Sequence, residues 1–214
     1  MPMNTAWPVR LEQGRIGLRP LSRRDERAWS ETRARNAAWL GPWDATTPIP
    51  GEGPRNYAAM WRLMNRQAKA GAGLPFAIEW AETVRSVPRF AGQLSVSSIT
   101  YGAFRSCTMG YWVDASLAGR GIMPVAVAMA SDYCFRELRL HRVEINIRPE
   151  NAPSLRVVEK LGFRDEGVRE RYLHIDGDWR DHRSFALFAE DCPGGVLEPL
   201  LERMGPEAAA PFRA

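Results

Sequence analysis

Two glycines, Gly119 and Gly121, stand directly before a stretch with the composition of a helix. Glycines let the backbone turn several N–H groups toward one point, and the first turn of a helix adds the positive end of its dipole. Such a loop suits an anion such as a pyrophosphate, with simple turn chemistry as the alternative role of the two glycines. The spacing matches neither the phosphate loop of nucleotide hydrolases nor the G-x-G-x-x-G fingerprint of dinucleotide-binding folds, which argues against both classes.

A second set of polar residues follows along the chain. Residues 142–148 alternate between apolar and polar side chains, which predicts a strand with one apolar face. Glu144 lies on the polar face and is a candidate base, with an ion pair to Arg142 or Arg148 as the alternative role. Asn151 and Ser154 come next, at the start of a predicted helix, where capping of that helix is the alternative role.

The elements that must position these residues form one α/β (α+β) domain with a mixed sheet. Ser22 is a predicted N-cap with Asp25 three residues on, and 41–54 is a loop rich in Pro and Gly. We expect the domain to span 1–192, with a frayed start over 1–10, and a C-terminal tail over 193–214 that holds a short helix or is disordered. The predicted strands are 16–21, 74–82, 90–99, 108–113, 142–148, 172–175 and 179–187, and the predicted helices are 22–40, 56–70, 123–138, 154–161 and 196–204.

The composition excludes several classes of protein. No run of 18 apolar residues is present, so we expect no membrane span, and the start of the chain lacks the pattern of a secretory signal. Three distant cysteines and three scattered histidines form no metal motif, and they fit a cytoplasmic protein with reduced thiols. The net charge is +4, and residues 10–35 hold eight Arg against four acids. This charge suits either a solvated helix face or approach to an RNA-rich particle such as the ribosome.

Five short segments within 109–187 then occur in an order that resembles the GNAT acetyltransferases, and within them the RimJ branch, the ribosomal-protein alanine N-acetyltransferases. The segments read G-Y-W-V at 110–113, G-R-G-I-M at 119–123, P-E-N-A-P-S at 149–154, L-G-F-R-D-E-G at 161–167 and I-D-G-D-W-R-D-H at 175–182. The sequence departs from the general phosphate-loop pattern at Ala118 and Met123. Val125 stands where the family usually has a Glu.

The resemblance implies a GNAT fold, a central mixed and mostly antiparallel twisted sheet of about seven strands with helices on both faces. It also implies acetyl-CoA as cosubstrate and no metal. The strand holding Tyr111, Trp112 and Val113 would splay from the strand 143–147, and the pantetheine arm would lie in the wedge. Asn151 would hold the lower arm, and Ser154 would protonate or hydrogen-bond the departing thiolate. The pyrophosphate would bind the backbone of the loop, namely Gly119, Arg120, Gly121, Ile122 and Met123.

The chemistry would be direct attack of an amine on a thioester. A free α-amine has a pKa near 8 and a lysine a pKa near 10.4, so an α-amine needs only a weak base. Glu144 is the candidate for that base. Trp43 beside the early loop, with Tyr172 and His174 on the predicted hairpin, could line the acceptor pocket, and packing is the alternative role for each. Trp39 belongs to the same group.

Three functions remain compatible with the sequence. The first is acetylation of a protein N-terminus, with a ribosomal protein as the example and ribosome association as a further expectation. The second keeps the chemistry and changes the acceptor to a small-molecule amine. The third is a ribosome-assembly protein that binds acyl-CoA and catalyses little. The sequence leaves open a monomer or a homodimer.

Overall fold

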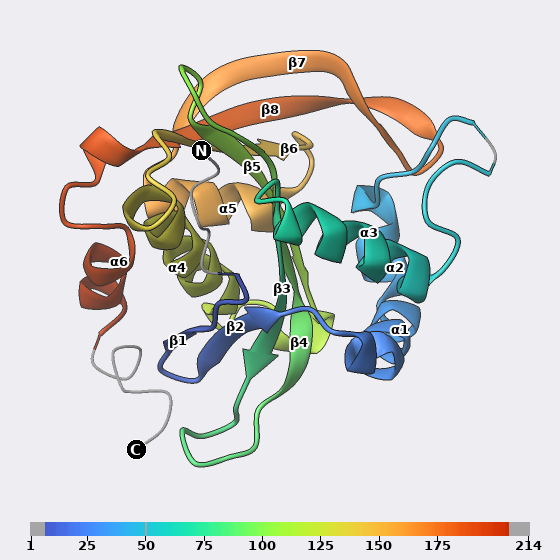
Figure 1. The fold of residues 1–214 in the computed structure, drawn as a ribbon, viewed down its shortest axis with the longest axis horizontal. Helices are drawn as coiled ribbons and strands as arrows, with labels where there is room; N and C mark the ends of the chain where they lie inside the picture. The colour runs from blue at the N-terminus through green and yellow to red at the C-terminus, as the bar shows by residue number, and fades with distance from the viewer. Residues whose placement is uncertain (1–6, 50, 206–214) are drawn as a thin grey trace.

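The computed structural model describes residues 7–49 and 51–205, and their centre is a twisted sheet of eight strands (Figure 1). The strand order is β1-β2-β3-β4-β5-β6-β8-β7, and every neighbouring pair is antiparallel except β5 and β6. The strands are β1 (Leu11–Gln13), β2 (Ile16–Pro20), β3 (Leu74–Trp80), β4 (Arg89–Thr100), β5 (Ser106–Val113), β6 (Arg142–Ile147), β7 (Arg164–Ile175) and β8 (Asp178–Phe188).

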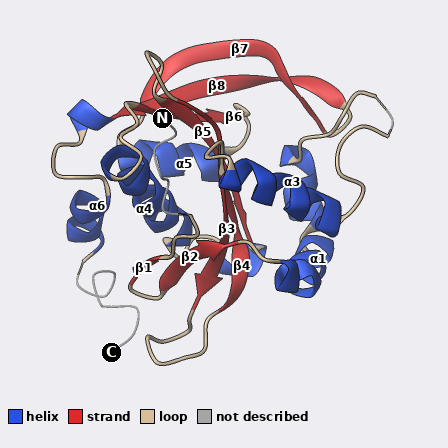
Figure 2. Ribbon diagram, viewed as in Figure 1, coloured by secondary structure: helices blue, strands red, loops and turns tan. Residues whose placement is uncertain are grey.

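Helices cover both faces of this sheet (Figure 2). One side holds α4 (Ile122–Arg136), α5 (Ala152–Leu161) and α6 (Leu197–Met204), and the other holds α1 (Glu26–Arg35) and α3 (Tyr57–Lys69). The short helix α2 (Ala37–Leu40) leads into the 3-10 turn η2 (Gly41–Trp43). This arrangement confirms the expected mixed, mostly antiparallel sheet with helices on both faces.

The main core lies between α4 and the sheet. Nearly every residue of α4 is buried, because the helix contacts β1, β2, β4, β5 and β6 as well as α5 and α6. A helix that is apolar all round is stable only when it is enclosed in this way. The smaller core on the other face is built by Leu21, Tyr57 and Ala77. Burying α4 fixes its N-terminus at the middle of the sheet, where β5 ends.

The structure differs from the sequence-based expectation in three elements. Strand β1 adds an eighth strand, and β7 begins at Arg164 rather than at Tyr172. The predicted helix 22–40 is divided at Asn36, whose amide nitrogen donates to the buried carboxylate of Asp114 at 3.2 Å. The cap at its start is confirmed, since Asp25 accepts from the Ser22 N–H at 2.7 Å and Ser22 Oγ accepts from the Arg24 N–H.

The C-terminal helix packs on the domain. Val196, Leu200 and Leu201 join the main core, and the Asp132 carboxylate accepts hydrogen bonds from the N–H groups of Val196 and Leu197. Of the frayed start expected over 1–10, residues 1–6 fall outside the described residues, whereas Trp7 and Val9 pack against the main core. The expected disorder beyond 205 also falls outside the described residues. Within the described ranges, no helix combines the length and the apolar character needed to cross a membrane.

Candidate active site

The site begins where β5 and β6 separate. The two strands are parallel and pair through Ser106, Cys107 and Thr108, and the last pair is Thr108 with Glu144. Beyond it β5 continues to Val113 and β6 to Ile147 without further pairing to each other. The free edges of the two strands therefore form a wedge, lined by backbone groups that an elongated ligand can bind.

The glycine loop closes one end of this wedge. Gly119 and Gly121 have φ angles of +80° and +77°, a region that side chains other than glycine rarely adopt. Gly121 is the N-cap of α4, so the free N–H groups of the first helical turn face the loop. The guanidinium of Arg120 lies 5.3 Å over the Trp80 ring, and the loop presents its backbone to the cavity through Gly119 and Gly121. A helix N-terminus preceded by such a loop is suited to a pyrophosphate.

A hydroxyl pair stands at the centre of the wedge. Tyr111 Oη and Ser154 Oγ are 2.9 Å apart, although Tyr111 lies on β5 and Ser154 on α5. Burial raises the pKa of Tyr111 well above its ordinary value, and the hydrogen bond with Ser154 offsets only part of that effect. Asn151 caps α5 by accepting from the Ser154 N–H at 3.1 Å, which orients the serine. Two hydroxyls that stay protonated at neutral pH are thus held side by side.

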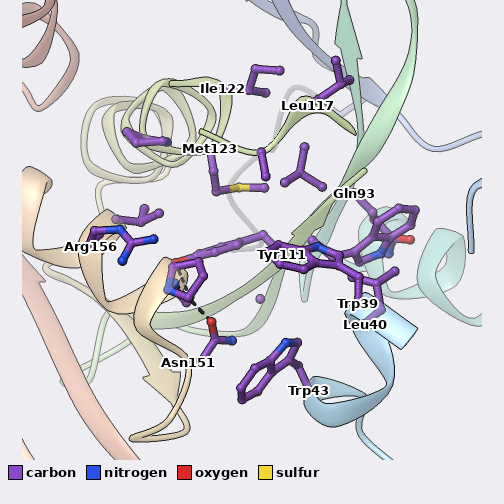
Figure 3. A pocket seen from close by; sticks show the side chains of 18 of the residues that line it. Trp39, Leu40, Trp43, Gln93, Tyr111, Leu117, Ile122, Met123, Asn151 and Arg156 are labelled. Carbon is purple, nitrogen blue, oxygen red and sulfur yellow. Dashed lines mark hydrogen bonds between the residues drawn. The ribbon is translucent and has the colours of Figure 1, made fainter. Parts of the chain in front are cut away.

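These features line one cavity of about 410 Å³. In Figure 3 the Tyr111 side chain extends across the cavity, with Arg156 and Asn151 toward one end and Trp39, Leu40 and Gln93 toward the other. Of the residues expected to bind the cosubstrate, those that line the cavity are Tyr111, Trp112, Val113, Gly119, Gly121, Ile122, Met123, Asn151 and Ser154. The structure brings these residues together around one cavity, and their binding to the cosubstrate remains a prediction.

The other end of the cavity is formed by α2, η2 and β4. Trp39 and Trp43 line it, and their role as an acceptor lip remains a prediction. The Arg148 guanidinium lies 5.5 Å over the Trp43 ring and donates to the Pro42 carbonyl at 2.7 Å. Gln93 adds a buried amide whose Oε1 accepts from Trp29 Nε1 at 2.9 Å. The side chains at this end are therefore largely aromatic, and hydrogen bonds and ring contacts with residues outside the cavity hold them in place.

Four expected site residues do not line the cavity, and the first is Arg120, whose guanidinium lies over the Trp80 ring. Tyr172 lies against the His182 ring, 5.7 Å away, and beneath the Arg169 guanidinium at 5.0 Å. His174 Nδ1 is 2.7 Å from Thr46 Oγ1, so it contacts the loop that follows Trp43 rather than the cavity. The roles of Tyr172 and His174 as substrate contacts remain predictions.

Glu144 is the fourth of these residues. It is buried, and its carboxylate accepts hydrogen bonds from Arg142, Asn146 and Arg169 at 2.8–3.0 Å. Burial alone would raise the pKa of Glu144, but the hydrogen bonds outweigh it and hold the pKa below its ordinary value of 4.5. A carboxylate with a lowered pKa is a weaker base. The geometry therefore favours a structural role for Glu144, and its assignment as the base remains a prediction.

Several cavity residues escaped the sequence analysis. Arg156 and Lys160 lie four positions apart on α5 and both line the cavity, which adds positive charge near the glycine loop. Their four-residue spacing on the helix predicted after Asn151 could have identified them from the sequence. Asp44 and Gln93 had no such signal, because only the packing of α1, η2 and β4 brings them to the cavity. Across the described ranges, no group of three or more metal-ligating side chains is gathered.

Comparison with known proteins agrees with this geometry. Residues 15–164 match the family model of the acetyltransferase (GNAT) domain. The ribosomal protein uS5-alanine N-acetyltransferase of Escherichia coli K12 is 30% identical over 190 residues, covering 87% of this chain and 94% of that protein. The probable N-acetyltransferase YjcK of Bacillus subtilis 168 is 41% identical over 103 residues, which span 48% of this chain and 57% of that protein.

Two solved structures extend the comparison to the fold. RimJ of Mycobacterium smegmatis in complex with CoA-disulfide has a TM-score of 0.84 at 37% identity, covering 92% of this chain and 96% of that one. The ribosomal-protein-S5-alanine acetyltransferase of Vibrio fischeri has a TM-score of 0.73 at 27% identity, covering 86% and 98%. The likeness to RimJ of Mycobacterium smegmatis extends over nearly the whole chain.

Proposed function

The chain belongs to the GNAT acetyltransferase family and is an acetyl-CoA-dependent N-acetyltransferase, and we propose that its acceptor is the N-terminal α-amine of a protein. A ribosomal protein is the acceptor best supported, because two similar proteins are described as acting on the alanine of ribosomal protein S5. Such an acceptor implies that the enzyme works in the cytoplasm.

One observation favours an α-amine over a lysine side chain. Among the described residues that line the cavity, the only carboxylate is Asp44, which is ion-paired to Arg33, and no histidine lines it. No strong general base is therefore in place. At neutral pH roughly a tenth of α-amines are already neutral, compared with well under a hundredth of lysines. An α-amine can lose its proton to a weak acceptor, including water.

The residues of the glycine-loop end fit CoA. The loop and the start of α4 offer backbone N–H groups for the pyrophosphate, and Arg156 and Lys160 add cationic side chains on the same side. The unpaired edge of β5 at Trp112 and Val113 offers backbone groups for the pantetheine arm. Asn151 contributes through its position at the start of α5. Acetyl-CoA supplies the activated acyl group as a thioester.

The protein's own groups then account for the transfer. As the amine nitrogen bonds to the acyl carbon, the carbon–sulfur bond breaks and the sulfur takes up a proton. The Ser154 hydroxyl, hydrogen-bonded to Tyr111, is placed to donate that proton or to stabilise the thiolate. A backbone N–H of the splayed strand β5 stabilises the oxyanion. The proton that leaves the amine passes to water or to a nearby weak base, and holding both reactants together lowers the barrier further.

The test is a comparison of acceptors at a fixed acetyl-CoA concentration. Peptides with a free N-terminal alanine and no lysine are compared with N-terminally blocked peptides that carry one internal lysine. CoA release and mass spectrometry of the products measure transfer. We expect acetylation of the first peptide at its α-amine. Preferential acetylation of the blocked peptide, or of free polyamines in a parallel reaction, would overturn the proposed acceptor.

A further inference from the structure

Asp44 occupies a distinctive place in the cavity. It follows η2 directly after Trp43 and lines the cavity together with Trp39 and Trp43. Among the described lining residues it is the only acid, whereas the lining cations Arg156 and Lys160 lie on α5. A carboxylate at the end where an amine must enter calls for a chemical explanation.

The side chain of Asp44 is held by a two-pronged ion pair. Arg33 Nη1 donates to Asp44 Oδ1 at 3.0 Å, and Arg33 Nη2 donates to Oδ2. The guanidinium itself is fixed, because it lies 5.5 Å from the rings of both Trp29 and Trp112. An arginine that is stacked in this way loses little entropy when it binds a carboxylate. The carboxylate is therefore presented in one orientation.

The backbone of Asp44 is held from the opposite side by the tip of the β7–β8 hairpin. The Asp176 N–H donates to the Asp44 carbonyl at 3.2 Å, and Ala45 forms a β-bridge with Ile175. The next residue continues the contact, since the Thr46 N–H donates to the His174 carbonyl at 2.9 Å. Two elements more than a hundred residues apart thus fix a single acid at the cavity wall.

We propose that Asp44 binds the protonated amine of the acceptor, with Arg33 and the hairpin tip as positioning elements. Each carboxylate oxygen accepts more than one hydrogen bond, so the bond from Arg33 leaves capacity for an ammonium. The inference rests on the proposed transfer to an amine and names the residue that recognises it.

Arg33 has a second effect on the bound amine. A bare carboxylate would stabilise the ammonium form, raise the pKa of the amine and make the neutral nucleophile scarcer. The positive charge of Arg33 largely cancels this effect, so the ion pair recognises N–H groups by hydrogen bonding while the pKa of the amine stays near 8. The acceptor amine can then bind to Asp44 and still lose its proton before it attacks.

The test compares Asp44→Asn with Arg33→Gln on the best acceptor from the panel above. Asp44→Asn removes a charge-assisted hydrogen bond, so the KM for the acceptor rises about tenfold or more, while the KM for acetyl-CoA changes little. Asp44→Glu keeps a carboxylate and recovers part of the affinity. Thermal unfolding of each variant shows whether the fold is retained.

Arg33→Gln serves as the matched control, because it breaks the same ion pair and leaves the carboxylate in place. The uncompensated carboxylate binds the ammonium more strongly and raises the pKa of the bound amine, so the apparent pKa in the pH profile of kcat moves upward. The KM for the acceptor does not rise as it does for Asp44→Asn. The two variants therefore change acceptor binding in opposite directions.

Other results would contradict the role of Asp44 or the proposed acceptor. If both variants raise the acceptor KM equally with no change in the pH profile, the ion pair only shapes the loop and the inference is wrong. An unchanged acceptor KM in Asp44→Asn also overturns it, even if peptides remain the acceptors. If only free amines are acetylated, the protein acceptor is wrong, and the same two variants tested on those amines still decide the role of Asp44.

Discussion

The two ends of the cavity are built in different ways. The glycine-loop end is formed by two short segments, residues 110–124 from β5 to the first turn of α4 and residues 151–160 of α5, so mostly local backbone geometry creates it. The acceptor end is assembled from α2, η2 and β4, and it is held by side chains and by a hairpin that is distant in sequence. Local backbone geometry suits a cosubstrate that does not vary. In a wall assembled from distant elements, substitutions can alter which acceptor binds without disturbing the fold.

The largest expected effect on turnover concerns Tyr111 and Ser154, where the two ends of the cavity meet. Replacing Ser154 by Ala and Tyr111 by Phe removes both hydroxyls that face each other across the wedge. We expect kcat to fall about 100-fold, the usual contribution of proton transfer by a positioned group, with little change in either KM. Steady-state kinetics of the single and double variants measures the effect.

The double variant also tests how the two hydroxyls cooperate. If they act as one unit, the double variant is hardly worse than the worse single variant. A thermal shift with CoA serves as the control for binding. Unchanged turnover in all three variants would remove Ser154 and Tyr111 from the chemistry.

The next largest effect concerns the glycine-loop end alone. Gly121→Ala forces a side chain into a left-handed conformation, which costs about 1–2 kcal/mol and corresponds to a roughly tenfold rise in the KM for acetyl-CoA. The acceptor KM stays the same, since that wall is built elsewhere.

A second substitution separates backbone strain from crowding in Gly121→Ala. A Cβ at position 121 would lie 2.6 Å from Met204 Cε, the end of a flexible side chain. Adding Met204→Ala relieves that contact and leaves the φ angle unchanged. Full recovery of acetyl-CoA binding in the double variant would mean that crowding, not the loop conformation, was the cause.

The contrast between local and assembled parts also explains which site residues and strands could be predicted from the sequence. The residues that line the glycine-loop end were predictable because their backbone pattern is local, and strand β6 was predictable because apolar and polar side chains alternate along it. Strand β1 is only three residues long, and the first half of β7 is a run of mainly charged, exposed residues. Neither has the apolar periodicity that marks a strand. Asp44 could not be identified, because its position depends on Arg33 and on the distant hairpin.

A smaller effect is expected where the hairpin supports the acceptor end. Thr46→Val removes the hydroxyl that contacts His174 Nδ1 at 2.7 Å and accepts from the Gly177 N–H at 3.2 Å. Each such hydrogen bond contributes about 1 kcal/mol, so we expect the acceptor KM to rise a few-fold through looser positioning of Asp44.

The KM for acetyl-CoA is the internal control for Thr46→Val. It stays constant if the hairpin supports the acceptor end alone. A rise in the acetyl-CoA KM of equal size would mean that the two ends are not independent, and the contrast between them would be lost.

The smallest effect on turnover is expected for Glu144→Gln. Glu144 lies behind the wedge and joins β6 to β7 through Arg169, so the variant should loosen the hairpin without removing a reacting group. Its lowered pKa adds stability at pH values above the ordinary 4.5, and this contribution is lost as the pH falls through the folded pKa. Glu144→Gln therefore lowers the melting temperature at pH 7 and flattens its decline toward pH 4. A large fall in kcat with loss of the pH dependence of turnover would instead make Glu144 the base, and the chemistry would then extend beyond the cavity wall.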